Sequence, residues 1–487
     1  MKKFNYLLML FSAVLITFSS CEDDPEPDDN GVTITGVPAT ATIEAGGTVG
    51  PVTATATALD GLRDLVITKD GAAFATVPLT GTTATAPFEY TALPEDAGKN
   101  VVFEFTVSDV DGDQAKVSHV LTVGAEATTI RVDEDITAEL TTWETGKTYI
   151  LGSRIVVESG ATLVIEPGVI VKGEVGTGAN ASALVIARGA KIEAVGSDTQ
   201  PIIFTSVADE IMPGQIASPN LDPELNGLWG GLIVLGRAKG SFAGNVTEIQ
   251  IEGIPPSDQR GLYGGSDDED DSGTLKYISI RHGGANIGEG NEINGLTLGA
   301  VGSGTEIEFV EVIGNQDDGI EWFGGTVNVT NAVVWNAGDD AIDADQAWNG
   351  TLDNFIVINA GDKSFELDGP EGAYVNGNYT LTNGSVSGGD AAGLVDNDDN
   401  TNVDMSNIYF FNIKAGQTFD QTPTVPVAFA NFQVTLPDGT AIGDFFKGTS
   451  AAATTAVAEG ENTVGADKAP FATWSWAAVS GSLDAFK

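Results

Sequence analysis

The feature that most constrains the fold is a set of five similar segments that recur between residues 275 and 392. Each runs from an apolar strand pattern into a corner rich in small or polar residues: LKYISIRHGGAN from Leu275, IEFVEVIGNQDD from Ile307, VTNAVVWNAGDD from Val329, LDNFIVINAGDK from Leu352 and LTNGSVSGGDAA from Leu381. The starts lie 32, 22, 23 and 29 residues apart. The shorter intervals are about the length of one coil of a right-handed parallel β-helix, and insertions at corners account for the longer ones. The repeats therefore predict an all-β domain of stacked coils over residues 125–487.

Such an array buries its inward side chains only when neighbouring coils stack on each other, so it should form one cooperative unit. Its two open ends need cover against pairing with other strands. We expect Thr128–Thr148 to cover the N-terminal end. The tail ATWSWAAVSGSLDAF, residues 472–486, is expected to cover the other end through Trp474 and Trp476.

Residues 31–124 have a different pattern. Short stretches such as VTITGV, VTATATAL, LVITKDG and FEFTVSDVDGDQ alternate apolar and polar residues, with turns about every ten residues. This pattern predicts a small antiparallel sandwich. The stretch VVFEFTVSDVDGDQAKVSHVLTV resembles the last hairpin of immunoglobulin-like or cadherin-like modules of bacterial surface proteins.

The first thirty residues resemble a targeting signal and predict the location of the protein in the cell. Lys2 and Lys3 precede an apolar stretch from Leu7 to Phe18 that is too short to span a bilayer, so residues 1–20 are interpreted as a signal peptide. Cys21 is the one cysteine of the chain and resembles the lipid-attachment cysteine of a bacterial lipoprotein. The acidic tether 21–30 resembles a surface-export signal of Bacteroidota lipoproteins. These resemblances imply an anchor in the outer membrane and a location on the cell surface.

The composition is strongly acidic, with 69 Asp and Glu against 22 Lys and Arg and a net charge of −47. Such a chain repels nucleic acid and anionic lipid headgroups, and it repels acidic polysaccharide unless a cation bridges the two. Calcium is therefore the expected cofactor, with an acidic surface that only keeps the protein in solution as the alternative.

The acidic residues cluster in three aligned repeats, QDDGIEWF from Gln316, GDDAIDAD from Gly338 and GDKSFELD from Gly361. Strand alternation points Ile320, Ile342 and Phe365 inward and the carboxylates of the next position outward. Neighbouring coils lie about 4.8 Å apart, so these carboxylates repel one another unless a cation or a proton intervenes. The candidate acids and bases of a catalytic site are Glu321, Asp343 and Glu366. The candidate calcium ligands are Asp317, Asp318, Asp339, Asp340, Asp267 and Asp268, where the last pair belongs to the acidic loop YGGSDDEDDSGT.

Four further residues are candidates for ligand binding. Asp345 and Asp368 follow the column two residues on, and Trp348 is expected beside an outer groove, where its ring would stack on a sugar. His282 opens a glycine-rich loop. With no second His or Cys in this domain it cannot form a typical transition-metal site, so a hydrogen-bonded corner residue is its alternative role.

A wider resemblance covers about half of the chain. The stretches IEPGVIVKGE, GLWGGLIVLGRA, IEGIPPSDQRGLYGG, YISIRHGGANIGEGNEINGLTLG and GDDAIDADQAW resemble an uncharacterised family of Bacteroidota surface lipoproteins with a pectate-lyase-like β-helix. The resemblance implies the fold and the location, and no activity. GDDAIDAD also resembles the Asp-Asp motif of polygalacturonases, but the Gly-His-Gly segment of that family does not follow it.

The sequence as a whole predicts a lipid-anchored surface protein whose β-helix binds glycan or a surface partner without catalysis. One alternative is a glycoside hydrolase or polysaccharide lyase that uses the outward carboxylates. The other is a structural accessory of an outer-membrane uptake complex. The expected partners are the membrane, through Cys21, and a polysaccharide or an outer-membrane protein, but not nucleic acid.

Overall fold

The structure is a computed structural model that describes residues 31–43, 47–124, 128–286, 293–419 and 424–487. The predicted signal peptide and the predicted tether, including Cys21, lie outside the described residues. The chain divides into two compact units between Glu126 and Ala127. No helix among the described residues has the length and apolar character needed to cross a membrane.

The first unit consists of two sheets around one core. Phe88, Phe103 and Phe105 meet edge to face in its centre, with ring centroids 4.8–5.1 Å apart for the pairs that include Phe88. The three-stranded sheet has the order β1-β3-β6 and the five-stranded sheet the order β2-β8-β7-β4-β5. The identification of this unit as an immunoglobulin-like module stays a prediction. Its elements are β1 (Thr33–Thr35), β2 (Thr40–Ile43), β3 (Thr48–Thr57), β4 (Leu62–Lys69), β5 (Ala72–Pro78), β6 (Thr83–Thr91), η1 (Pro94–Asp96), β7 (Asn100–Asp109) and β8 (Gln114–Val123).

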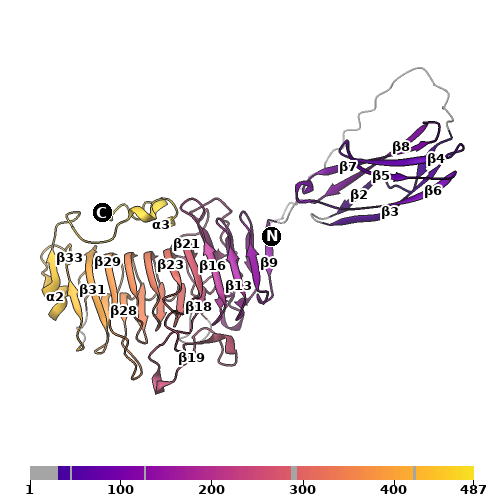
Figure 1. The fold of residues 1–487 in the computed structure, drawn as a ribbon. Helices are drawn as coiled ribbons and strands as arrows, with labels where there is room; N and C mark the ends of the chain where they lie inside the picture. The colour runs from indigo at the N-terminus through magenta and orange to yellow at the C-terminus, as the bar shows by residue number, and fades with distance from the viewer. Residues whose placement is uncertain (1–30, 44–46, 125–127, 287–292, 420–423) are drawn as a thin grey trace, which may run out of the picture. The chain divides into compact units, whose positions relative to one another are not determined.

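The second unit is the predicted parallel β-helix, and Figure 1 shows its strands stacked side by side from β9 (Thr129–Val132) to β33 (Phe432–Val434). Its early coils are formed by β9 (Thr129–Val132), β10 (Leu140–Trp143), β11 (Thr148–Leu151), β12 (Arg154–Val157), β13 (Thr162–Ile165), β14 (Ile170–Gly173), η2 (Gly178–Asn180), β15 (Ala183–Ile186), β16 (Lys191–Val195), β17 (Ile202–Ser206) and β18 (Leu232–Leu235). An insertion then carries η3 (Ala243–Asn245), β19 (Ile249–Gln250), η4 (Gln259–Gly261) and β20 (Leu262–Tyr263).

Later coils alternate one long and one short strand. The long strands are β21 (Gly273–Arg281), β23 (Glu306–Ile313), β25 (Asn328–Trp335), β27 (Thr351–Ile358), β29 (Tyr379–Ser387) and β31 (Val403–Phe411). The short strands are β22 (Leu296–Gly299), β24 (Ile320–Phe323), β26 (Ile342–Asp345), β28 (Lys363–Leu367) and β30 (Gly393–Asn397). The predicted register is confirmed, because Leu275, Ile307, Val329, Leu352 and Leu381 pair in that order across β21 to β29.

Each long strand bends at one residue with positive φ. Tyr277 and Phe309 occupy this position in the first two long strands and asparagines in the next four. Asparagine suits the position because its short polar side chain tolerates the left-handed conformation. The asparagines also bond along the stack, as where the amide of Asn354 donates to Asn331 at 2.6 Å. The bend therefore explains why β16 and β17, two separate strands, both pair with the single strand β21.

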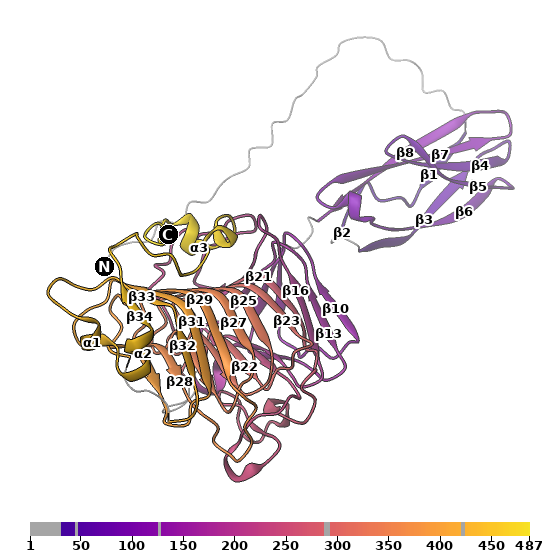
Figure 2. The same cartoon turned by 60° about the vertical axis from the view of Figure 1, so that its left-hand side comes forward.

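The C-terminal end is not covered by the tail, contrary to the sequence prediction. It is covered by β32 (Ala428–Ala430), β33 (Phe432–Val434), α1 (Ile442–Phe445), α2 (Gly448–Ala453) and β34 (Thr454–Ala456), visible together in Figure 2. Phe445 and Phe446 enter the core there. At the other end, residues 128–148 form the first coil itself, and its Trp143 stacks on Tyr149 of β11 at 4.8 Å.

The tail instead lies along the outer face of the long strands. It contains α3 (Trp476–Val479), which Figure 1 shows near β21 and β23, and it directly follows η5 (Ala469–Phe471). The backbone N–H groups of Trp476 and Ala477 donate to the buried carboxylate of Glu311 at 3.0 and 2.9 Å. Arg281 lies 3.8 Å from that carboxylate and beneath the Trp476 ring. The prediction that the tail covers the C-terminal end failed because an apolar tail can cover either a side or an end of the β-helix. Here it covers the side, where aromatic side chains of the long strands would otherwise be exposed to water.

Candidate functional site

The site begins at one corner of the later coils, immediately before the short strands. Asn294, Asp318, Asp340 and Lys363 occupy equivalent positions in four successive coils, each two residues before the paired apolar residues Leu296, Ile320, Ile342 and Phe365. The carboxylate of Asp318 accepts a hydrogen bond from the backbone of Asp340 at 2.9 Å. Asp340 in turn accepts from the backbone of Lys363 at 2.6 Å. The corner acids thus help to hold the coils in register.

A second column of acids stands on the short strands themselves. Glu321 pairs with Asp343, Asp343 with Glu366 and Glu366 with Asp396 across β24, β26, β28 and β30. Ile320, Ile342 and Phe365 point into the core, as predicted. The carboxylates point to the opposite face, but that face is not open to water at this end. Glu321 is 6% exposed and Asp343 is 8% exposed.

The two columns meet in a buried triad of carboxylates. Oxygen atoms of Asp318, Glu321 and Asp343 all lie within 4.8 Å of one another. The carboxyl groups of Asp318 and Asp343 are hydrogen-bonded, and so are those of Asp340 and Glu366. Because an ionised carboxylate is an acceptor only, each of these pairs needs a shared proton, which a bound cation would replace.

Burial and like charge raise the pKa values of this cluster. Burial is the main cause in each case and lifts the pKa of Glu321, Asp343 and Asp318 well above the ordinary range. The charge of Asp343 adds to the effect on Glu321, and that of Asp317 to the effect on Asp318. Burial and the hydrogen bond to Glu366 raise the pKa of Asp340 to about 10.

Basic side chains of the described residues do not compensate this cluster. None of the ion pairs identified in the described ranges includes Asp318, Glu321 or Asp343. Lys363, one coil beyond Asp340 in the corner column, pairs instead with Asp362 at 2.9 Å. Arg281 is buried beneath the tail beside Glu311. The triad therefore has the chemistry of a divalent-cation site, which requires several oxygen ligands at 2.3–2.6 Å.

The column becomes more open towards the C-terminal coils. Glu366, Asp345, Asp368 and Asp396 are half-buried. Burial is the main cause that raises the pKa of Asp345 to about 8, and the negative charge of Glu371 is the second cause. Burial is also the main cause that raises the pKa of Asp368 to about 6, and the negative charge of Asp398 is the second cause. We call Asp345, Glu366, Asp368 and Asp396 the acidic strip.

The six predicted calcium ligands divide into two groups. Asp317, Asp318 and Asp339 form one close cluster, and Asp339 and Asp340 form another with Asp362. Asp318 belongs both to the cluster of predicted metal ligands and to the triad with the predicted catalytic residues Glu321 and Asp343. Asp267 and Asp268 belong to none of the close clusters found among the described residues. Asp268 is bound by Lys239, whose ammonium lies 2.5 Å away.

The prediction for Trp348 is wrong. Its side chain is 0% exposed and lies in the core of the β-helix, where its ring stacks on Trp322 at 4.6 Å. Its indole N–H donates to the backbone carbonyl of Val327 at 3.0 Å. The alternation rule failed here because Gln346 and Ala347, just after β26, have positive φ and redirect the chain. A sugar cannot stack on this ring in the folded protein.

His282 is a buried corner residue, which was the alternative to ligand binding. It has positive φ, at a bend where Asn336 and Asn359 stand in later coils. Its Nδ1 lies 2.6 Å from the carbonyl oxygen of Leu225, and its ring meets that of Trp476 edge to face. Burial lowers its pKa. These contacts belong to the face beneath the tail and give His282 no place in the carboxylate triad.

Two residues of the site were missed from the sequence. The buried amide of Asn294 donates to Glu321 and, at 3.1 Å, to Glu252. Asn294 could have been found by extending the corner column one coil towards the N-terminus. The longer loop that precedes Asn294 makes the repeat difficult to recognise in the sequence. Glu252 carried no signal because it lies in the insertion, outside every repeat.

The family model for the pectate-lyase like beta helix domain matches residues 135–477. The chain belongs to this family. Membership relates the β-helix to the fold of polysaccharide-degrading enzymes, and it confirms the pectate-lyase-like part of the sequence resemblance. The Bacteroidota lipoprotein family and the immunoglobulin-like module stay predictions.

Two further comparisons add little to the pectate-lyase-like assignment. The structure of the family 28 exopolygalacturonase of Yersinia enterocolitica matches with 12% identity over 83% of this chain and 88% of that chain, at a TM-score of 0.18. A TM-score this low carries no argument. No curated protein matches the chain.

Proposed function

We propose that this pectate-lyase-like β-helix binds calcium through Asp318, Glu321 and Asp343 and holds an acidic polysaccharide at the acidic strip without cleaving it. The observation that carries the proposal is the triad itself, in which three buried carboxylates converge within 4.8 Å. Uncompensated carboxylates at this separation are costly in a low dielectric, and a divalent cation converts that repulsion into attraction.

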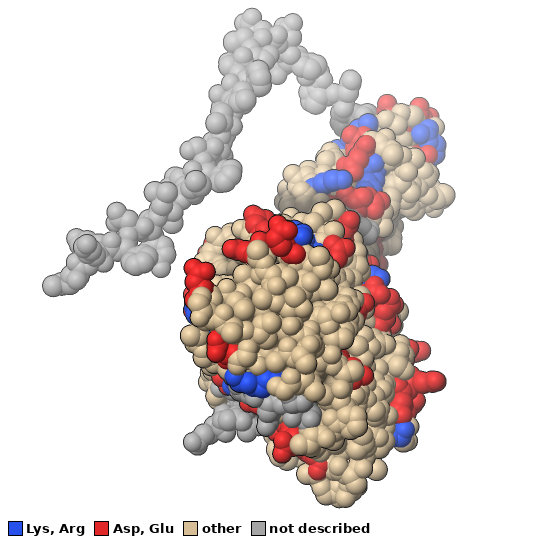
Figure 3. Space-filling view, turned by 90° about the vertical axis from the view of Figure 1, so that its left-hand side faces the viewer, with Lys and Arg blue, Asp and Glu red and all other residues tan. Residues whose placement is uncertain are grey.

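The charge of the protein favours calcium as the bridge to the ligand. The chain carries 69 Asp and Glu against 22 Lys and Arg, and patches of Asp and Glu outnumber those of Lys and Arg on the face drawn in Figure 3, which is otherwise uncharged. An acidic polysaccharide would be repelled by such a surface without a cation. Calcium accepts six to eight oxygen ligands, so a triad leaves positions for carboxylates or hydroxyls of a sugar. Because Trp348 is internal, recognition would rely on the cation and polar groups rather than on stacking by this ring.

Hydrolysis is the second candidate, and the shared protons favour it. A general acid needs a carboxyl group that stays protonated near neutral pH, which burial provides at Asp340 and Asp345. Asp343 and Glu366 are paired neighbours, and carboxyl groups about 5 Å apart are typical of retaining glycosidases. A lyase is less well supported, because Arg281 is engaged beneath the tail and Lys363 with Asp362.

Calcium titration followed by a polysaccharide panel tests the proposal. The chain from Glu22 to Lys487 is titrated by calorimetry and then mixed with neutral and acidic polysaccharides, with calcium or with EDTA. We expect calcium to bind more tightly than about 10⁻⁴ M, and acidic polysaccharide to be retained only with calcium and without new chain ends. Absence of calcium binding would exclude the proposal, whereas new chain ends would favour hydrolysis.

We also propose that Cys21 carries the lipid anchor that places the protein on the cell surface. In cells fed a labelled fatty acid, the wild-type chain should become labelled and sediment with outer membranes. Cys21→Ser should lose both properties, since serine cannot form the thioether linkage. Surface protease treatment of intact cells should degrade the wild-type chain. Equal membrane association of the two chains would contradict the anchor, and capture of an outer-membrane protein by the wild type would favour an accessory role.

A further inference from the structure

The insertion between β18 and β21, residues 236–272, forms a packed layer on the outer face of the short strands. Phe242, Ile251, Ile254 and Tyr263 are buried against this face. They share a cluster with Ile233 and other residues of the early short strands. Figure 1 shows β19, within this layer, on the side of the β-helix beneath β18. The insertion is therefore a fixed part of the fold rather than a loose loop.

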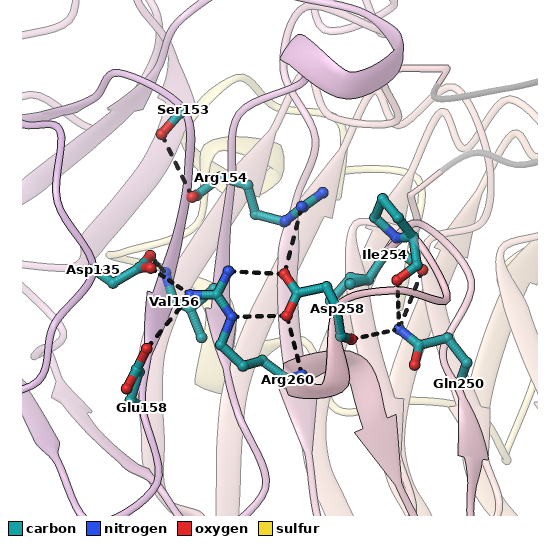
Figure 4. Close-up of polar contacts among 10 residues, drawn as sticks. Asp135, Ser153, Arg154, Val156, Glu158, Gln250, Ile254, Asp258 and Arg260 are labelled. Carbon is teal, nitrogen blue, oxygen red and sulfur yellow. Dashed lines mark hydrogen bonds and ion pairs between the residues drawn. The ribbon is translucent and has the colours of Figure 1, made fainter.

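The middle part of the insertion is clamped to the first coils by Arg260, as Figure 4 shows. Its Nε and Nη2 donate to the two oxygens of Asp258, each at 2.8 Å. Its Nη1 donates to Asp135 and lies 3.5 Å from Glu158. Asp258 is also 3.7 Å from Arg154. A guanidinium with this fork geometry fixes the orientation of the whole turn.

The segment 250–260, which Arg260 holds in place, also carries Glu252 close to the carboxylate triad. The Gln250 amide donates to the carbonyls of Ile254 and Asp258, both at 3.2 Å, which closes the segment around Glu252. Glu252 accepts from the Asn294 amide at 3.1 Å, and the same nitrogen donates to Glu321. One amide group thus separates Glu252 from the triad.

Asn294 supplies an independent sign that the site takes a ligand. Its side chain is 0% exposed, and its Oδ1 has no hydrogen-bond partner among the described residues. A buried amide oxygen without a partner is costly. Amide oxygens are ordinary calcium ligands. A half-turn of the amide would exchange its nitrogen for this oxygen at the place between Glu252 and Glu321, where a cation would satisfy the oxygen and offset the repulsion between the two carboxylates.

We infer that Glu252 is a fourth carboxylate ligand of the cation site, delivered by the insertion, and that Arg260 is the residue that positions it. The inference rests on the proposed function and adds to it a ligand from outside the repeats. It also assigns the insertion a role. The triad itself comes from two neighbouring coils of the β-helix, and Glu252 would add a carboxylate from the insertion that covers them.

Terbium luminescence tests this assignment, because terbium replaces calcium at oxygen sites and its lifetimes in H2O and D2O count the coordinated waters. We expect Glu252→Gln to weaken terbium affinity about tenfold and to add about one coordinated water. Glu248→Gln is the matched control, since Glu248 lies on the same insertion and pairs with Arg188 at 2.7 Å. It should change neither quantity. Thermal unfolding in EDTA verifies that each variant folds, and Glu252→Asp provides a second variant that keeps the charge.

The positioning role of Arg260 is tested by a double-mutant cycle. Arg260→Gln should weaken terbium binding, and the double variant Arg260→Gln, Glu252→Gln should bind no more weakly than Glu252→Gln alone. Additive losses would overturn the positioning role. Unchanged affinity and water count in Glu252→Gln, with binding by the wild type, would overturn the ligand assignment alone. A wild type that binds neither calcium nor terbium would overturn the proposed function and the inference with it.

Discussion

Asp343→Asn is expected to reduce calcium affinity more than about a hundredfold, since it removes a charged ligand, and even residues behind metal ligands contribute tenfold to a hundredfold. Asp343 is the centre of the site, because it contacts Asp318 and pairs in register with both Glu321 and Glu366. Calorimetric titration measures the loss directly. Asp390→Asn is a suitable control, since Asp390 pairs with Lys414 on the surface.

The same substitution should have the opposite effect on stability when no cation is present. Asp343 is buried among Asp318, Glu366 and Asp345, and burial raises its pKa well above the ordinary range. An asparagine amide can donate to Asp318 as the protonated acid does, but it needs no proton from solvent. In EDTA at pH 8 the variant should therefore melt a few degrees above the wild type. With calcium, the order should reverse. If both chains melt alike under both conditions, the triad is a structural scaffold that binds no cation.

The second large effect expected is a fall in stability with rising pH when divalent cations are removed. The folded-state pKa values of Asp345, about 8, and Asp340, about 10, lie above the value of about 4 for an unfolded aspartate. The folded chain then holds protons that the unfolded chain has released, so the free energy of unfolding decreases as pH rises. This contribution is greatest below pH 4 and is lost once the pH has risen through 8 for Asp345 and 10 for Asp340.

Calcium should oppose this trend, because it binds the ionised carboxylates that high pH produces. Denaturation midpoints are compared at pH 5, 7 and 9, each with calcium and with EDTA. We expect the difference between the two curves to widen with pH. Neutralisation of the buried His282, whose pKa is lowered, contributes equally to both curves and cancels in the difference. Curves whose difference does not change with pH would show that the acidic cluster binds no cation, and an EDTA curve that does not fall with pH would show that it holds no protons.

Much of the β-helix followed from the sequence because each coil repeats the same apolar positions. Leu275, Ile307 and Val329 could be aligned by spacing alone, and a parallel stack leaves only one register that buries them. The same alternation placed Glu321, Asp343 and Glu366 on the outer face. Local rules of this kind depend only on neighbours within a strand and on the next coil.

The role of the aromatic residues could not be obtained in this way. Trp348 follows two residues of positive φ, which sequence alternation does not anticipate, and it therefore entered the core instead of a groove. Trp474 and Trp476 were assigned to an end of the stack. They cover a side, because Tyr277 and Phe309 stack there at 4.3 Å and need apolar cover.

The sequence by itself determined the architecture, the acidic character and the columns of carboxylates, since all three depend on periodic residues within the repeats. Only the tertiary structure decided that these carboxylates form a buried site. Burial depends on the insertion, whose Glu252 and Arg260 lie outside the repeats and contact coils that are distant in the sequence. The pKa values follow from that cover, because desolvation is their main cause and no pattern of residues along a strand encodes it.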